Sequence, residues 1–166
     1  MNATQPEVAV RPATPGDRDA LLELWSVAAE NDARPVDTPE AVARLLQRDP
    51  GACLVAESEA RLVGSVIAGW DGWRAHLYRL AVHPDHRRRG IARRLLDAAE
   101  ERLVDLGATR ADAMVLSTNA LGRQLWSGLG YVEQQEWRRW VKPLKDRKST
   151  RLNSSHRCLV CRLLLE

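Results

Sequence analysis

Residues 80–92 read Leu80-Ala81-Val82-His83-Pro84-Asp85-His86-Arg87-Arg88-Arg89-Gly90-Ile91-Ala92, and they carry the clearest structural signal of the 166-residue chain. A short apolar strand runs into a loop that contains a proline, and three arginines and a glycine then open a helix. The first turn of a helix has unpaired backbone N–H groups and a partial positive charge, and glycine lets a phosphate approach the backbone. The stretch therefore predicts an anion site with room for a diphosphate.

The three arginines allow two interpretations, and the residues alone leave both open. They can be the solvated, charged start of a surface helix. Positive side chains at a helix N-terminus are unfavourable for the helix dipole, however, and an anionic ligand would offset that cost.

On both sides of this stretch the sequence predicts a mixed α/β domain. Residues 91–106 repeat apolar side chains at helical spacing, and Gly107 stands where a helix C-cap belongs. Apolar periodicity and turn residues predict further helices at 18–29, 38–49 and 119–129. Strands are expected at 8–11, 53–56, 62–68, 77–82 and 113–116, with a final pair of strands or one bent strand at 131–141. This order, β α α β β β α β α β, contains no internal repeat.

The composition narrows the class of protein. A single domain with its own core is expected from 166 residues of which 45% are hydrophobic. The start has no secretion-signal pattern and no apolar run reaches about 18 residues, so a cytoplasmic location without membrane contact is expected. Residues 146–166 carry the whole net charge of +3, and the neutral remainder argues against nucleic-acid binding. Three cysteines, an odd number, do not predict a disulfide framework.

Several motifs together make the chain resemble the GNAT acetyltransferases. Residues 87–92 match the Q/R-x-x-G-x-G/A signature of that family and follow the Leu-Ala-Val-His-Pro strand end typical of it. Asn119 and the run 129–131, Leu-Gly-Tyr, stand where the family has its late Asn and its Leu-Gly-Phe/Tyr. The resemblance extends from Val8 to about Leu144, and residues 63–72 look like those of a subgroup of small bacterial members whose substrates are mostly unassigned.

The resemblance implies a fold and a co-substrate. The fold would be a mixed, mostly antiparallel central sheet, splayed at its fourth strand and flanked by about four helices. Acetyl-CoA would bind as co-substrate, without a metal. Backbone groups around Leu80, Ala81 and Val82 would bind the pantetheine arm and the acetyl carbonyl. The diphosphate would be held by the backbone of the signature residues, Arg87, Arg88, Arg89, Gly90, Ile91 and Ala92.

Two further positions are expected to touch the co-substrate. Asn119 would contact it from the next helix, although the residue is equally suited to cap that helix, and both roles can hold. Many family members have a tyrosine seven residues later that protonates the departing thiolate, but this chain has Trp126. An indole can pack against the co-substrate but cannot act as an acid. A thiol with a pKa near 8.5 leaves fairly well without help.

His76 is the first candidate for the general base. Some family members have a glutamate at this position, and a histidine can accept a proton from an ammonium group near neutral pH, directly or through water. Strand alternation would put His76, Tyr78, Leu80 and Val82 on one face, with Tyr78 as the second catalytic candidate. The alternative for His76 is a surface polar residue near a strand start.

The resemblance gives the reaction but not the acceptor. The expected reaction is acetyl transfer from acetyl-CoA to a primary amine, by direct attack in a ternary complex. Arg34, between the first two helices, could bind a carboxylate of the acceptor, or it could simply face solvent. Because the usual tyrosine is missing, the alternative function is a non-catalytic acyl-CoA-binding regulator. The family often forms a homodimer, and the sequence does not indicate whether this chain does.

The C-terminal segment looks foreign to the domain. Residues 146–156, DRKSTRLNSSH, resemble a translated sequencing adapter. The chain is therefore divided into a GNAT domain at 1–145 and a non-native tail at 146–166. Within that tail His156-x-Cys158-x-x-Cys161 offers only three zinc donors, so no metal site is expected.

Overall fold

A five-stranded sheet forms the centre of the computed structural model, which describes residues 7–28, 36–142 and 144. Its strands are β1 (Ala9–Pro12), β2 (Cys53–Ser58), β3 (Arg61–Trp70), β4 (Ala75–Val82) and β5 (Ala111–Ala113). They lie in chain order, with β1 to β4 antiparallel and β5 parallel to β4. This arrangement confirms the predicted mixed, mostly antiparallel sheet.

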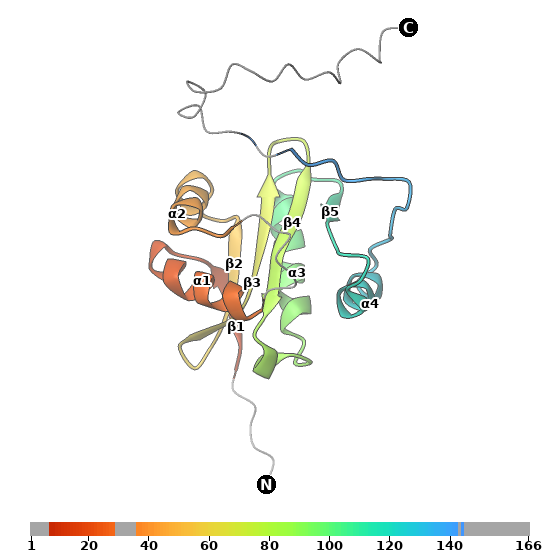
Figure 1. Ribbon diagram of the computed structural model, residues 1–166. Coiled ribbons are helices and arrows are strands. Elements are labelled where there is room, and N and C mark those ends of the chain that lie inside the picture. Colours follow the sequence, from red (N-terminus) through yellow and green to blue (C-terminus); the bar gives the residue numbers. More distant parts are fainter. Residues whose placement is uncertain (1–6, 29–35, 143, 145–166) are drawn as a thin grey trace, which may run out of the picture. The chain divides into compact units, whose positions relative to one another are not determined.

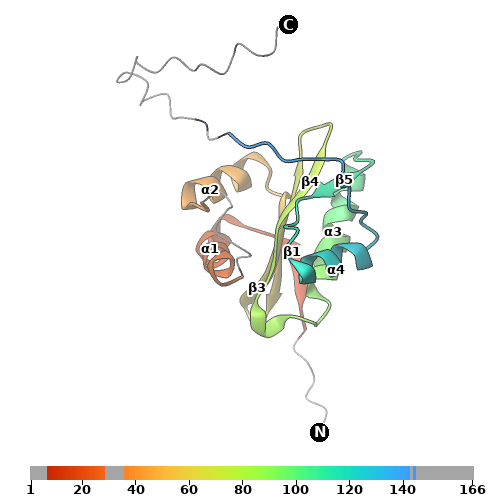
Figure 2. The same cartoon turned by 45° about the vertical axis from the view of Figure 1, so that its right-hand side comes forward.

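Helices cover both faces of the sheet, as Figures 1 and 2 show. The helices α1 (Arg18–Val27) and α2 (Pro39–Arg48) lie on one face, and α3 (Ile91–Asp105) lies on the other, with α4 (Ala120–Gly128) beside β5. Two short 3₁₀ turns, η1 (Pro15–Asp17) and η2 (Pro84–His86), precede α1 and α3. No helix in the described part of the chain is long and apolar enough to cross a membrane.

Each face of the sheet has its own apolar core. Between the sheet and α3, buried side chains include Leu77, Ile91 and Leu95, and we call this group the α3 core. Between the sheet and the first two helices, buried side chains include Leu21, Trp25 and Ile67, and we call this group the α1–α2 core. Since alternate residues of a strand face opposite sides, the core that a β4 side chain joins shows which way it points.

Local sequence fixes the ends of the two helices that matter most for the site. Thr38 caps α2 by accepting a hydrogen bond from the Ala41 N–H at 3.2 Å, and Pro39 occupies the first turn. Helix α3 begins directly after Gly90 and ends before Gly107, and both glycines have positive φ, +73° and +93°. The predicted helix at 91–106 is confirmed to within one residue.

Two predicted strands differ from the structure. The strand expected at 113–116 lies instead at 111–113, and Met114 beyond it is 62% exposed. Residues 113–116 form a continuous apolar run, but pairing with β4 ends at Ala113, and β propensity has little effect without a paired neighbour. The strands expected at 131–141 are absent from the described residues, which form only a turn there. Contacts divide the chain after Tyr131, and residues 132–166 form a separate unit.

Candidate active site

Strands β4 and β5 separate partway along their length. They pair at only three positions, the last between Leu77 and Ala113, whereas β4 continues to Val82. In the described part of the chain no strand pairs with this side of β4 from residue 78 onward. The predicted splay at the fourth strand is therefore present as an unpaired edge five residues long.

The backbone groups that face this gap can be identified from the pairing with β3. The His83 N–H donates to the Val63 carbonyl at 2.9 Å, so the backbone groups of His83 point toward β3. Backbone groups alternate sides along a strand, so those of Ala81 also point toward β3. The backbone N–H and C=O of Leu80 and Val82 therefore point into the gap. An edge of this kind can hydrogen-bond an extended ligand.

A β-bulge in β4 changes which face its side chains occupy. Ser65 and Ile67 of β3 are two positions apart, but their partners on β4, Ala81 and Tyr78, are three positions apart. Arg79 lies in the bulge with φ +54°. An extra residue of this kind reverses the alternation of side chains.

The reversal is visible in the two cores. Before the bulge Leu77 belongs to the α3 core, so His76 and Tyr78 point to the α1–α2 side. After it, Leu80 and Val82 pack against the α3 core, while Ala81 joins the α1–α2 core. The prediction that His76, Tyr78, Leu80 and Val82 share one face is therefore wrong.

The loop after β4 leads into an open helix N-terminus. Arg88 and Gly90 both have left-handed φ, +62° and +73°. No atom lies within 4 Å of where a Cβ on Gly90 would be, so the approach to the first backbone N–H groups of α3 is clear. The first turn of the helix contains no acidic residue. These features fit a phosphate or diphosphate group.

The signature side chains around this loop have different environments. Arg87, Arg88 and Arg89 are exposed, and the Arg87 Nε donates to the Val82 carbonyl at 3.2 Å. Ile91 is buried in the α3 core and Ala92 is half-buried, so at these two positions the backbone is what a ligand could reach.

Asn119 and Trp126 lie at the two ends of α4. The Asn119 side chain caps the helix by accepting from the Gly122 N–H at 2.7 Å, which agrees with the capping role considered for it. Trp126 packs edge-on against Tyr131, with ring centroids 4.7 Å apart, and both rings contact the α3 core. The packing of Trp126 against a co-substrate stays a prediction.

His76 has a partner that sequence reasoning missed. Its imidazole Nδ1 is hydrogen-bonded to a carboxylate oxygen of Asp112, the residue that lies opposite it on β5. Both side chains are about half exposed, at 48% and 50%. Since Nδ1 is engaged, Nε2 is the nitrogen left to face a substrate. A carboxylate on one imidazole nitrogen orients the ring.

Tyr78 lies two residues further along the same face. Tyr78 is 45% exposed, and its ring lies over Gly69, where an added Cβ would be 3.3 Å from the Tyr78 Cε1. Burial raises the pKa of the Tyr78 phenol above its usual value. The phenol therefore stays protonated near neutral pH and can donate a hydrogen bond, but it is a poor base.

Other candidates lie elsewhere. Arg34 and the histidine and cysteines of the tail are outside the described residues. A cavity of about 270 Å³ lies between α1 and the β2–β3 hairpin, lined in part by Arg11, Asp17 and Glu57. Arg11 bonds both carboxylates, so these three charged groups pair with one another, and Glu23 and Arg61 also line the cavity. The cavity is not on the gap between β4 and β5.

Comparison with known proteins agrees with this geometry. A family model described as the acetyltransferase (GNAT) family matches residues 18–131. An acetyltransferase of Pectobacterium atrosepticum is 40% identical over 104 residues, which are 62% of this chain and 72% of that protein. An uncharacterized N-acetyltransferase of Yersinia pestis is 39% identical over 119 residues, or 71% of this chain and 83% of that protein.

Solved structures share the fold. A Salmonella typhimurium protein solved with its cofactor acetyl-CoA has a TM-score of 0.63 and 26% identity, covering 75% of this chain and 79% of that one. The diaminobutyrate acetyltransferase of Paenibacillus lautus, solved with L-2,4-diaminobutyric acid and coenzyme A, has a TM-score of 0.66 and 24% identity. This match covers 75% of the present chain and 75% of the Paenibacillus lautus chain.

Proposed function

Because the chain belongs to the GNAT family of acetyltransferases, we propose that it transfers an acetyl group from acetyl-CoA to a primary amine in a ternary complex. The observation that carries the proposal is the unpaired edge of β4 directly beside the open N-terminus of α3. These two features offer hydrogen-bonding groups for an extended arm and for a diphosphate, which are adjoining parts of the same ligand.

Acetyl-CoA enters as substrate and brings the activated acetyl thioester. The backbone of Leu80 and Val82 hydrogen-bonds the pantetheine arm and the acetyl carbonyl. The backbone from Arg87 to Ala92 binds the diphosphate, where Gly90 leaves the approach open. The three arginines add positive charge around the anion, and this offsets their unfavourable position at a helix start.

His76 acts as the general base in this proposal. It lies four residues before Leu80, with the Arg79 bulge between them, so the proton passes through water rather than directly. Asp112 holds the Nδ1 side of the ring, so that Nε2 accepts. Tyr78, protonated and on the same face, is the second candidate to contact the acceptor.

The chemical step needs no acid from the protein. The neutral amine nitrogen bonds to the thioester carbonyl carbon, and the carbon–sulfur bond breaks. The amine proton reaches His76, and CoA leaves as a thiolate that takes a proton from solvent. Trp126 cannot supply that proton, but a thiol with a pKa near 8.5 makes a fair leaving group.

The acceptor is proposed only as a class. Its primary amine reaches the thioester from the α1–α2 side, where His76 and Tyr78 point. Arg34, at the connection between α1 and α2, would bind a carboxylate if the acceptor has one. That role stays a prediction.

A second function competes with this one. With Trp126 where many members have tyrosine, a regulator that binds acyl-CoA without turnover is the alternative. The two differ in amine-dependent release of the free thiol of CoA. An acetyltransferase releases it with at least one amine, whereas a regulator binds acetyl-CoA and releases none.

A further inference from the structure

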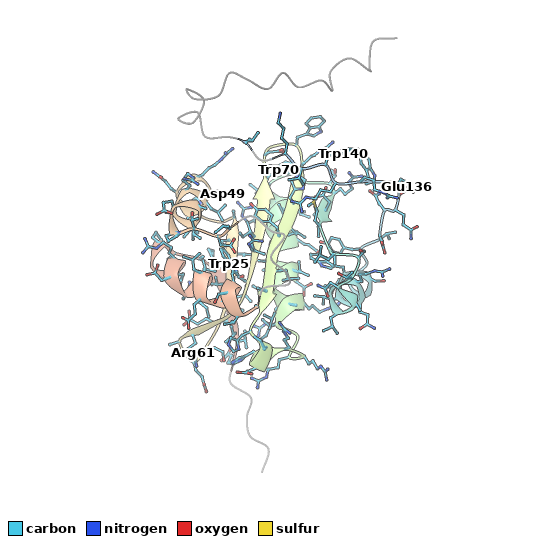
Figure 3. All side chains as sticks on the ribbon, viewed as in Figure 1. Trp25, Asp49, Arg61, Trp70, Glu136 and Trp140 are labelled. Carbon is cyan, nitrogen blue, oxygen red and sulfur yellow. The ribbon has the colours of Figure 1, made fainter. Side chains whose placement is uncertain are left out.

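A buried polar network connects the β4 bulge to α1 and to the start of α2. The Trp25 indole N–H donates to the Ser65 hydroxyl at 2.8 Å, and that hydroxyl donates to the Arg79 carbonyl at 3.1 Å. The Arg79 guanidinium lies 5.9 Å from the centre of the Trp25 ring and donates to Asp37 from Nε at 2.8 Å and from Nη2 at 2.5 Å. Trp25, labelled in Figure 3, therefore contacts the Arg79 guanidinium directly and reaches the Arg79 carbonyl through Ser65.

The backbone of Arg79 needs such support. With φ +54° the residue is left-handed, a conformation that costs a side chain other than glycine about 1–3 kcal/mol. Strained residues persist where their surroundings determine the conformation, and they gather at functional sites. Arg79 immediately precedes Leu80, whose backbone faces the gap beside β4.

The network is shielded from water, so the loss of any of its hydrogen bonds or of its ion pair is costly. Ser65 is fully buried and Trp25 is 3% exposed. The side chains of Arg79 and Asp37 are 19% and 16% exposed. Removing one member of a largely buried ion pair leaves the other charge uncompensated, an effect far larger than loss of a surface pair.

We propose that Arg79 is a positioning residue of the acetyl-CoA site, held by Asp37, Trp25 and Ser65 in the left-handed form that directs the Leu80 backbone into the gap. The proposal rests on the proposed function, because it assumes that this edge binds CoA. The network does not touch the substrate. It fixes the direction of the Leu80 backbone, which does contact the substrate in this proposal. It also joins α1 and the start of α2 to Arg79.

The test measures CoA affinity by calorimetry in wild type and in three variants. Asp37→Asn removes the charge that holds the guanidinium, and we expect CoA affinity to fall at least fivefold. In the double variant Asp37→Asn/Arg79→Gly, glycine adopts the left-handed backbone without support, and we expect affinity to return to within twofold of wild type. Deleting Arg79 also removes the charge that Asp37→Asn leaves unpaired, so recovered stability is expected of any buried ion pair, and recovered CoA affinity is the result specific to the positioning role.

Asp49→Asn is the matched control. Asp49, also labelled in Figure 3, accepts from Arg102 at 2.5 Å, and this pair is 31% and 19% exposed. It joins the end of α2 to α3, away from the bulge. We therefore expect Asp49→Asn to lower the melting temperature about as much as Asp37→Asn does, but to leave CoA affinity unchanged.

The possible results distinguish the positioning role of Arg79 from the proposed function itself. Unchanged affinity in Asp37→Asn, or a double variant as weak as the single one, overturns the positioning role alone. An equal loss of affinity in Asp49→Asn also overturns it, because general destabilisation then explains the effect. If wild type does not bind CoA at all, the proposed function fails first, and this inference fails with it.

Discussion

The imidazole of His76 is bonded to the carboxylate of Asp112 across β4 and β5, although 36 positions separate the two residues in the chain. The contact lies one position before the two strands stop pairing. It places a base with an oriented ring at the entrance to the gap where we propose that acetyl-CoA binds. The chemistry of the site can therefore be tested at a pair of residues rather than at one.

Replacing His76 should affect the rate and not the binding of acetyl-CoA. We expect His76→Ala to lower kcat/KM by roughly 10²–10⁴, the usual worth of general base catalysis, because the amine then loses its proton acceptor. Asp112→Asn should lower kcat/KM less, about tenfold or more, since the base remains but its ring is no longer oriented by a carboxylate. Steady-state kinetics together with calorimetry of acetyl-CoA measures both.

The pH profile distinguishes this role from a structural one. If His76 takes the amine's proton, kcat/KM in wild type should fall on the acid side, because an imidazole that already carries a proton cannot accept another. That acid limb should vanish in His76→Ala. An alanine variant that keeps wild-type kcat/KM at every pH would make His76 a structural residue, and the base would then be sought elsewhere.

The diphosphate site can be tested at Gly90, the residue that precedes α3. Gly90→Val should weaken CoA affinity at least tenfold, or about 1.4 kcal/mol, because a side chain there blocks the approach to the backbone N–H groups. Gly107→Val is the control at the other end of the helix. Gly107 also has a positive φ and open space around it, so the substitution imposes similar strain without touching the anion site. Equal CoA affinity in wild type and a folded Gly90→Val variant would remove diphosphate binding from this loop.

The N-terminal connection should stabilise the domain in a pH-dependent way. Asp17 accepts hydrogen bonds from Arg11 Nη1 at 2.8 Å and from the Thr14 N–H at 2.7 Å. The Arg11 guanidinium, with help from Thr14, holds the pKa of Asp17 well below its usual range. A carboxyl with a lowered pKa stabilises the fold above about pH 4, and its contribution is lost as pH falls toward the folded-state pKa.

Asp17→Asn should therefore lower the free energy of unfolding by about 1–3 kcal/mol at pH 7, and the difference from wild type should shrink below about pH 4. Denaturant unfolding at several pH values measures it. Asp19→Asn is the control, since Asp19 is 78% exposed and pairs with its neighbour Arg18 at the surface. A loss from Asp17→Asn that is the same at every pH would show that the charge of Asp17 is not what stabilises the fold.

Residues after Lys145 should be dispensable. A chain that ends there is expected to keep the melting temperature and the activity of the 166-residue chain, because the tail has no periodic apolar pattern that a core would need. Thermal unfolding of the two chains compares them directly. A drop of several degrees on truncation would show that the tail contributes to the fold.

Local signals explain what the sequence could predict. The helix after Gly90, its end at Gly107 and the anion-binding loop depend on glycines and on apolar spacing within one segment, and both are readable without tertiary contacts. The cap at Asn119 is local in the same way.

What the sequence did not reveal depends on contacts between distant segments. The bulge falls on an arginine, with no glycine to signal it, and its support comes from Trp25 and Ser65 on other elements. The side-chain alternation of β4 was therefore mispredicted beyond Tyr78. Asp112 was missed because its neighbour His76 is known only once the register of β4 and β5 is known.

The central claim is that the chain acetylates an amine, and free-thiol release from acetyl-CoA across a panel of amines tests it most directly. The panel should include small amines, peptide N-termini, lysine and aminoglycosides, with product identified by mass spectrometry. We expect thiol release that requires an amine, equals the amount of acetylated product and falls at least a hundredfold in His76→Ala. Acetyl-CoA that binds but releases no thiol with any amine of the panel would contradict the account and favour the acyl-CoA-binding regulator.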